Sequence, residues 1–356
     1  MILRRVRFLV AAASVTILAA CRSGTDPSLG AGRTWRMGFS AFPPRNDIAL
    51  ALRALDQWTR RADAAIMHIG IPWAGLLQGI APDSLLKADG VGLAEYFRGK
   101  GLPLTVTLDV TDGLNRSAEA PDLVAAGRSI TEPAVQQLYR GYAVAVARLL
   151  RPDFLGLAAE TNLIRVAAPV ALYQAVVAMT NAVVPEIRVL NGGVRLYVSV
   201  QVETAWGRLG QGGGYVGVER DLADFPFVDA LGLSSYPYLG GFREPEEIPV
   251  DYYARLAGGR TQPMLLVEGG WASESAEGFV SSPERQARYV SYQAALAERA
   301  KLERLFQLSF TDLDLTSFPG APAILPLFAR LGLVDIELRP KPALAAWDEI
   351  VARPRR

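Results

Sequence analysis

The sequence predicts an α/β protein built as one (β/α)8 barrel domain. Its apolar residues alternate eight times between short runs rich in β-formers and longer stretches with the 3.6-residue period of a helix. Half of the 356 residues are hydrophobic, which is enough for a large core, and no Pro- or Gly-rich break divides the chain beyond residue 34. An open, doubly wound sheet is the alternative. However, the first expected strand runs into Ser40-Ala41-Phe42-Pro43-Pro44 instead of a Gly-rich phosphate loop.

The eight expected strands are mostly continuous apolar runs. Such runs are typical of parallel strands that are buried on both faces, because helices cover the sheet on each side. We expect strands at residues 35–39, 65–71, 102–108, 154–159, 196–202, 230–235, 264–267 and 305–310.

The stretches between these strands have a helical pattern, and several begin with a recognisable cap. Asp47, Thr131 and Ser282 stand where a side-chain oxygen can accept a hydrogen bond from the first turn, and Pro or an acid follows closely at the last two. We expect helices at residues 47–61, 84–99, 132–150, 171–183, 218–223, 251–256, 283–300 and 343–351. Eight such pairs predict a closed TIM barrel.

The composition excludes several classes of function. The chain has 37 Lys and Arg against 36 Asp and Glu, so it has no positive surplus for binding nucleic acid. One Cys and one His exclude an intramolecular disulfide and a zinc site made of Cys and His clusters. No Lys follows an expected strand, and His68 lies within one, where we expect a hydrogen-bonded core residue. Carboxylates and Tyr therefore remain as the main catalytic groups, and we expect neither a cofactor nor a metal.

The N-terminus has the features of an export signal. Three Arg precede an apolar run at residues 8–20, which is too short to span a bilayer, and Cys21 follows it. The sequence Leu18-Ala19-Ala20-Cys21 resembles the lipobox of bacterial lipoproteins, and an ordinary secretory signal is the alternative. The resemblance implies a signal peptide at 1–20, a lipid on Cys21, a tether at 21–34 and the barrel at 35–352. It predicts an exported lipoprotein whose only membrane attachment, to the cell or outer membrane, is the N-terminal lipid. We also expect a monomer.

Carboxylates follow most of the expected strands, at the end of a barrel where active sites lie. Glu160 and Glu268 interrupt their apolar runs most abruptly. A buried charge needs a partner or a function, so pairing with an Arg is the alternative for each. Because the fourth and seventh strands lie across the barrel, we expect the two carboxyl groups to face each other about 5 Å apart, the separation in retaining glycosidases.

These residues resemble a known group of enzymes. A Glu after the fourth strand, another after the seventh and a Tyr after the sixth are similar to the clan A glycoside hydrolases. The segment Glu268-Gly-Gly-Trp271 resembles the arabinogalactan endo-β-1,4-galactanase branch. The resemblance implies that Glu160 is a protonated acid/base, that Glu268 is a charged nucleophile, and that Tyr236 donates a hydrogen bond to Glu268. The chain departs from the pattern at Ala159, where the clan has Asn, and lacks the Arg expected after the second strand.

Further side chains near the same strand ends are candidates for binding a carbohydrate. Aromatic rings stack on the flat face of a sugar, and polar groups hydrogen-bond its hydroxyls. The candidates are Trp73, Trp206, Tyr238 and Trp271 together with Asn162, Glu203 and Asp312. Two other functions remain open. One is a carbohydrate-binding barrel lipoprotein without catalysis; the other is a barrel enzyme whose ring of Asp109, Glu160, Glu203 and Asp312 holds Mg²⁺ or Ca²⁺.

Overall fold

In a computed structural model of the chain, the predicted barrel is present. The structure describes residues 32–209, 213–276, 278–317 and 323–356. The expected signal peptide, Cys21 and nearly all of the expected tether therefore lie outside the described residues.

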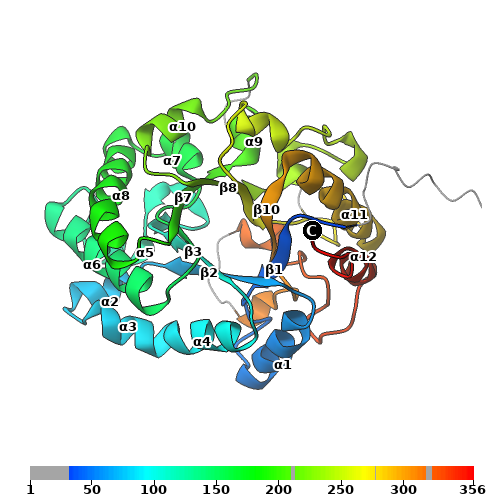
Figure 1. Ribbon diagram of the computed structural model, residues 1–356, viewed down its shortest axis with the longest axis horizontal. Helices are drawn as coiled ribbons and strands as arrows, with labels where there is room; N and C mark the ends of the chain where they lie inside the picture. The colour runs from blue at the N-terminus through cyan, green and yellow to red at the C-terminus, as the bar shows by residue number, and fades with distance from the viewer. Residues whose placement is uncertain (1–31, 210–212, 277, 318–322) are drawn as a thin grey trace, which may run out of the picture. The chain divides into compact units, whose positions relative to one another are not determined.

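Eight parallel strands close into a barrel, and Figure 1 shows them at the centre with helices around them. All eight expected strands are confirmed, with ends that differ by a few residues. In order around the barrel they are β1 (Arg36–Ser40), β2 (Ala64–Gly70), β3 (Leu104–Asp109), β6 (Phe154–Gly156), β7 (Arg195–Gln201), β8 (Ala230–Ser235), β9 (Met264–Gly269) and β10 (Leu302–Ser309).

A small apolar cluster that includes Phe154, Tyr197 and Phe306 fills the barrel interior. The Tyr197 ring needs glycine beside it, because a Cβ on Gly156 would lie 2.6 Å from that ring. The Tyr197 hydroxyl shares a 2.5 Å hydrogen bond with the hydroxyl of Thr107 and donates to the carbonyl of Val106. The barrel is thus a packed core whose open space lies beyond the strand ends.

The outer layer contains the expected helices, with some changes of extent. The main helices are α1 (Ile48–Thr59), α3 (Pro82–Asp89), α4 (Val91–Gly99), α6 (Pro133–Leu149), α8 (Val170–Leu190), α10 (Glu219–Asp224), α11 (Pro283–Ala300) and α12 (Pro342–Val351). The stretch 84–99 is two helices, because the chain bends at Gly90, and the expected helix at 251–256 is a 3₁₀ turn, Ala254–Ala257. Asp47 and Ser282 cap their helices as expected. The assignment of Thr131 was wrong: Glu132 occupies the cap position of α6.

Several short elements beyond the strand ends were not predicted. A hairpin of β4 (Thr111–Asp112) and β5 (Asn115–Glu119) follows β3, and α7 (Thr161–Ala167) follows β6. The hairpin turn is held by the Asp112 side chain, which accepts hydrogen bonds from the backbone of Leu114 and Asn115. The other short helices are α2 (Trp73–Leu77), α5 (Pro121–Ala125) and α9 (Val202–Ala205). Of these elements, the hairpin and α7 contribute residues that line the cavity described below.

The helix α8 extends to Leu190, beyond the expected end at 183. Among the described residues it is the one helix that is long and apolar enough to cross a membrane by length and composition alone. Its buried residues, which include Leu172, Val176 and Val183, recur at helical spacing, and α8 packs beside α6 in the outer layer.

The ordered barrel begins before residue 35. Arg33, which we expected in the tether, is buried; it pairs with Asp63 at 2.6 Å and donates to the carbonyl of Val351. These contacts bind the first described residues to the end of α12.

Candidate active site

A cavity of about 480 Å³ lies at the carboxyl ends of the strands. Glu160, Glu268 and Tyr236 all line it. The structure therefore brings together the three residues that the sequence singled out for catalysis, and it shows what surrounds each of them.

Strand β8 lies between the two carboxylates and donates a hydrogen bond to each. Side chains alternate along a strand, so Ser234 and Tyr236 share one face and Ser235 points the other way. The Ser234 hydroxyl donates to Glu160 at 2.7 Å, and the Tyr236 hydroxyl donates to Glu268 at 2.6 Å. Burial and the charge of Glu268 raise the pKa of Tyr236 well above its ordinary value, so its hydroxyl stays protonated as a donor.

Glu160 is held from several sides and in a strained backbone conformation. Its φ of 47° lies in the left-handed region, which costs energy for a residue other than glycine and is common at functional sites. Its backbone N–H donates to the hydroxyl of Ser199 at 2.9 Å, and its carboxylate also accepts from Arg116 Nε at 2.9 Å. With Ser234 on the other oxygen, both oxygens of Glu160 are occupied.

Arg116, on β5, also lines the site, and the apolar pattern of the sequence did not indicate it. Its guanidinium lies between Glu160 and Asp109, with Nη1 at 2.5 Å from the Asp109 carboxylate. Burial alone would lower the pKa of Arg116, but the charges of Asp109 and Glu160 outweigh it and raise the pKa. Arg116 therefore stays charged, and its guanidinium binds the carboxylates of both Glu160 and Asp109. The signal available in the sequence was the Asp112-Gly113 turn, which places an Arg within a short hairpin.

Glu268 ends β9 in a different environment. Its hydrogen-bond donor among the described residues is Tyr236, and His68 Nε2 lies 3.8 Å from its other oxygen. Burial, followed by the charge of Glu160, raises the pKa of Glu268 from its ordinary value to about 7, although Tyr236 and Arg116 act in the opposite direction. Glu268 therefore gains or loses its proton close to neutral pH.

The surroundings of Glu268 thus differ from those that the resemblance implies. We expected the charge on Glu268, but its pKa is raised to about 7, because burial and the charge of Glu160 outweigh the effects of Tyr236 and Arg116. Glu160, in contrast, pairs with a cation, the guanidinium of Arg116.

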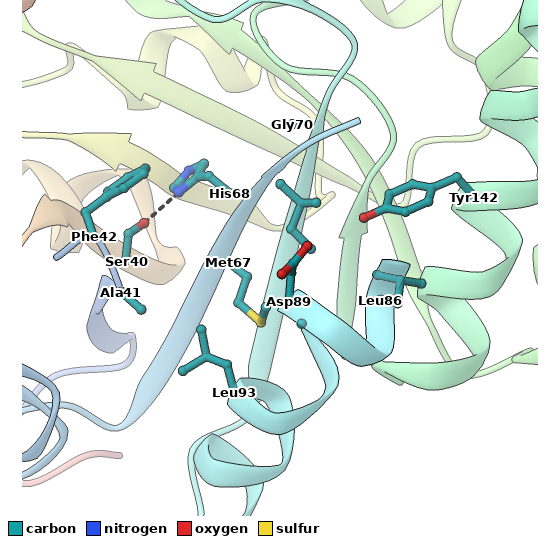
Figure 2. A pocket seen from close by; sticks show the side chains of 12 residues that line it. Ser40, Ala41, Phe42, Met67, His68, Gly70, Leu86, Asp89, Leu93 and Tyr142 are labelled. Carbon is teal, nitrogen blue, oxygen red and sulfur yellow. Dashed lines mark hydrogen bonds between the residues drawn. The ribbon is translucent and has the colours of Figure 1, made fainter. Parts of the chain in front are cut away.

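His68 lines the same cavity and also a second one of about 280 Å³. Figure 2 shows its ring beside Phe42, with the 2.6 Å hydrogen bond between its Nδ1 and the Ser40 hydroxyl. Burial lowers the pKa of His68 to about 4, so its ring is neutral at pH 7. The expected hydrogen bond is present, but the ring borders the cavity instead of lying wholly in the core.

The three polar residues expected to bind substrate do not line this cavity. The Asn162 side chain bonds the backbone of Gln201 in both directions, at 2.7 and 2.9 Å. Glu203 is fully buried, and Asp312 accepts from Lys341 Nζ at 2.5 Å and from the backbone of Gly332. Each side chain fastens one part of the fold to another, so the expectation of direct substrate contact is corrected for all three.

The four aromatic candidates are also absent from the residues that line the cavity. Trp73 and Trp271 are buried in the core, and Trp271 packs against Tyr289 with the ring centres 5.2 Å apart. Tyr238 is buried and donates to the carbonyl of Leu327, and Trp206 donates to the carbonyl of Tyr252. Because none of the four rings lines the cavity, none offers a stacking face to a sugar bound there.

The carboxylate ring proposed for a metal ion does not form. Asp109 and Glu160 share Arg116, whereas Glu203 and Asp312 bind other partners. Within the described part of the chain, no three or more His, Cys, Asp and Glu side chains come close enough to hold an ion. The metal-dependent alternative therefore has no site in this arrangement.

Comparison with known proteins finds the same fold in several glycoside hydrolases. No family model matches the sequence, and no curated protein does. Among solved structures, the exo-β-1,4-mannosidase of Opitutaceae bacterium strain TAV5 superposes with a TM-score of 0.64 at 17% identity, over 90% of this chain and 59% of that one. A family 39 glycoside hydrolase of Bacteroides cellulosilyticus WH2 gives 0.60 at 15% identity, over 90% and 64%. Xylanase 10B of Thermotoga maritima gives 0.59 at 13%, over 89% and 95%.

This chain thus spans less than two thirds of the first two of these enzymes. At these identities the likeness concerns the fold. The protein has the closed eight-stranded parallel barrel that these glycoside hydrolases share.

Proposed function

We propose that the protein is a retaining glycoside hydrolase in which Glu268 is the nucleophile and Glu160 the acid/base. The observation that carries the proposal is one cavity lined by two strand-end carboxylates in unlike surroundings. Retaining hydrolysis needs two such groups: one attacks the sugar carbon, and the other protonates the departing oxygen and then activates water. The Glu268-Gly-Gly-Trp271 segment also supports, within this proposal, a likeness to the endo-β-1,4-galactanase branch.

The reactive form has the charge on Glu268 and the proton on Glu160. Because the pKa of Glu268 is raised to about 7, the nucleophile is the charged form that Glu268 takes as the pH rises through this value. The positive charge that develops on the sugar carbon lies beside Glu268 and stabilises its charged form. Tyr236 donates to the same carboxylate and fixes its orientation.

The test uses dinitrophenyl β-glycosides of galactose, mannose, glucose and xylose. We expect wild type to cleave at least one with retained configuration, as followed by NMR. Glu268→Gln should abolish this activity. Glu160→Ala should retain activity on the dinitrophenyl substrate, because its leaving group needs no proton, and azide should then give the glycosyl azide with retained configuration. An inverted product contradicts the mechanism.

A carbohydrate-binding barrel without turnover is the second candidate. The contacts of Glu160 favour it, because Arg116 and Ser234 occupy both carboxylate oxygens and leave neither free to protonate a leaving group. Ala159, in the place of the expected Asn, favours it as well. Binding of a sugar without cleavage of any dinitrophenyl glycoside would support this candidate over the first.

We also propose that the protein is an exported lipoprotein anchored through Cys21. The support is the sequence Leu18-Ala19-Ala20-Cys21 after a short apolar run. In a bacterial host, wild type should incorporate radioactive palmitate and Cys21→Ser should not. Absence of label in wild type contradicts the proposal.

A further inference from the structure

The cavity has two chemically different parts. Its polar residues come mostly from the strands and their ends, among them Thr107 on β3, Gln201 on β7 and Ser309 on β10, next to the two glutamates. Its apolar residues come mostly from the segments beyond the strands. Ten of the 21 lining residues are Leu, Ile or Phe.

The apolar wall is formed by side chains from separate loops. Leu114 lies in the hairpin turn, Leu163 in α7, Leu239 in a 3₁₀ turn after β8, and Leu313 and Ile324 after β10. These side chains are partly or largely exposed, and Ile324 has an exposed fraction of 38%. Five apolar side chains from four separate segments thus line the same cavity.

Such a wall suits an apolar ligand better than a chain of sugars. Each additional sugar would bring hydroxyls that need hydrogen-bond partners, and leucine offers none. The indoles that could stack on sugar rings are placed elsewhere, because Trp73 and Trp271 are in the core. A hydrocarbon group in contact with the wall would instead be removed from water, which is favourable in proportion to the buried area.

We propose that the group attached to the sugar is a hydrocarbon: the substrate is the glycoside of a long-chain or lipid-like alcohol. This inference rests on the proposed function, because the carboxylates fix where the sugar binds. The sugar occupies the polar end beside Glu160 and Glu268, and the alkyl chain lies along the wall of Leu114, Leu239 and Leu313. A volume of about 480 Å³ is within the range of sites for small molecules.

The first experiment measures kcat/KM for methyl, butyl, hexyl and octyl glycosides of the sugar that the dinitrophenyl series selects, all below their micellar concentrations. We expect kcat/KM to rise about three-fold for each added methylene until the wall is covered. An oligosaccharide of the same sugar should be a poorer substrate than the octyl glycoside. The inference is wrong if kcat/KM does not change with chain length, or if the oligosaccharide is the better substrate. In either case, cleavage of the dinitrophenyl glycoside still supports the proposed hydrolase activity.

The second experiment measures binding, so that the outcome does not depend on turnover. With Glu268→Gln, calorimetry should show octyl glycosides of the four sugars binding at least ten-fold tighter than the methyl glycosides. Free octanol should bind more weakly than the best octyl glycoside, since it lacks the sugar. Equal affinity for octyl and methyl glycosides overturns the inference. If octyl glycosides bind more tightly but the wild-type protein cleaves no dinitrophenyl glycoside, the result supports binding of the alkyl chain at the apolar wall and contradicts the proposed hydrolase activity.

The double variant Leu313→Asn with Ile324→Asn makes the wall polar. It should lower the ratio of octyl to methyl affinity about ten-fold. Leu52→Asn is the matched control, because Leu52 is a 60% exposed leucine of α1 that does not line the cavity. The control should leave the ratio unchanged. An equal loss in both variants contradicts a specific role for the wall.

Discussion

Glu203 and Glu268 look alike in the sequence but differ in the structure. Each follows an apolar strand, yet Glu203 is fully buried and Glu268 keeps a side-chain exposure of 20%. Glu203 accepts hydrogen bonds from four groups: the side chains of Gln201, Ser235 and Tyr252 and the backbone of Tyr236. For Glu268 the corresponding donor is the hydroxyl of Tyr236. A carboxylate at a strand end whose oxygens already accept several hydrogen bonds stabilises the fold. A carboxylate that faces a cavity and accepts few hydrogen bonds can still bind a substrate or take part in a reaction.

The alternation of β8 produces this division. Ser234 and Tyr236 direct their side chains to the two cavity carboxylates, whereas Ser235, between them, directs its hydroxyl to Glu203. A shift of one residue in the register of β8 would exchange these partners. The same three residues thus separate the structural acid from the two candidate catalytic acids.

The largest expected difference between the two acids concerns stability. Glu203→Ala leaves four buried donors without an acceptor, so we expect it to lower the free energy of unfolding by about 4 kcal/mol. Glu268→Ala leaves one buried donor, the hydroxyl of Tyr236, without an acceptor and should cost only about 1 kcal/mol. Urea denaturation of both variants at pH 7 measures the difference. Equal losses would show that the contrast in donor number has no energetic consequence.

A second difference should appear as a pH dependence. The folded protein raises the pKa of Glu268 from its ordinary value to about 7, so between about pH 4.5 and 7 the folded state binds more protons than the unfolded state. This group therefore contributes stability at low pH, and the contribution is lost as the pH rises. Glu268→Gln removes the effect. It should increase the free energy of unfolding by up to about 3 kcal/mol at pH 8 and change it little at pH 4.

Glu160→Gln is the matched variant for that measurement. It leaves Arg116 with a neutral partner in place of a charged one, so we expect a loss of about 2 kcal/mol at pH 8, opposite in sign to the gain in Glu268→Gln. Unfolding free energies at pH 4, 6 and 8 compare the two. A gain of stability in both variants would mean that Arg116 does not stabilise the charge of Glu160.

The sequence predicted the positions of the strands and the placement of the two glutamates at strand ends, because both depend on local patterns. A buried parallel strand is a continuous apolar run, and a charged residue that ends such a run is conspicuous. The position of Arg116 depends instead on a short hairpin that folds back over the barrel, which apolar periodicity does not reveal. The aromatic candidates failed for a related reason. Adjacency to a strand end does not specify direction, and Trp271 turns into the core after Gly270, whose φ of 156° a larger residue rarely adopts.

Arg116 permits the last and smallest test, a shift in the pH profile of kcat/KM. In Arg116→Gln the cation beside the two carboxylates is lost, so the pKa of Glu268, which Arg116 lowers, should rise further above its ordinary value. The acidic limb of the profile, which follows the loss of the proton from Glu268, should therefore move up by about one pH unit. The shift should be the same with an alkyl and with a dinitrophenyl glycoside, because both reactions need a charged Glu268. Arg116→Lys keeps the charge and should return the limb toward wild type, which separates an electrostatic role from a loss of packing. A profile that stays in place in Arg116→Gln would assign Arg116 to the support of the hairpin and leave the difference between the two carboxylates to burial alone.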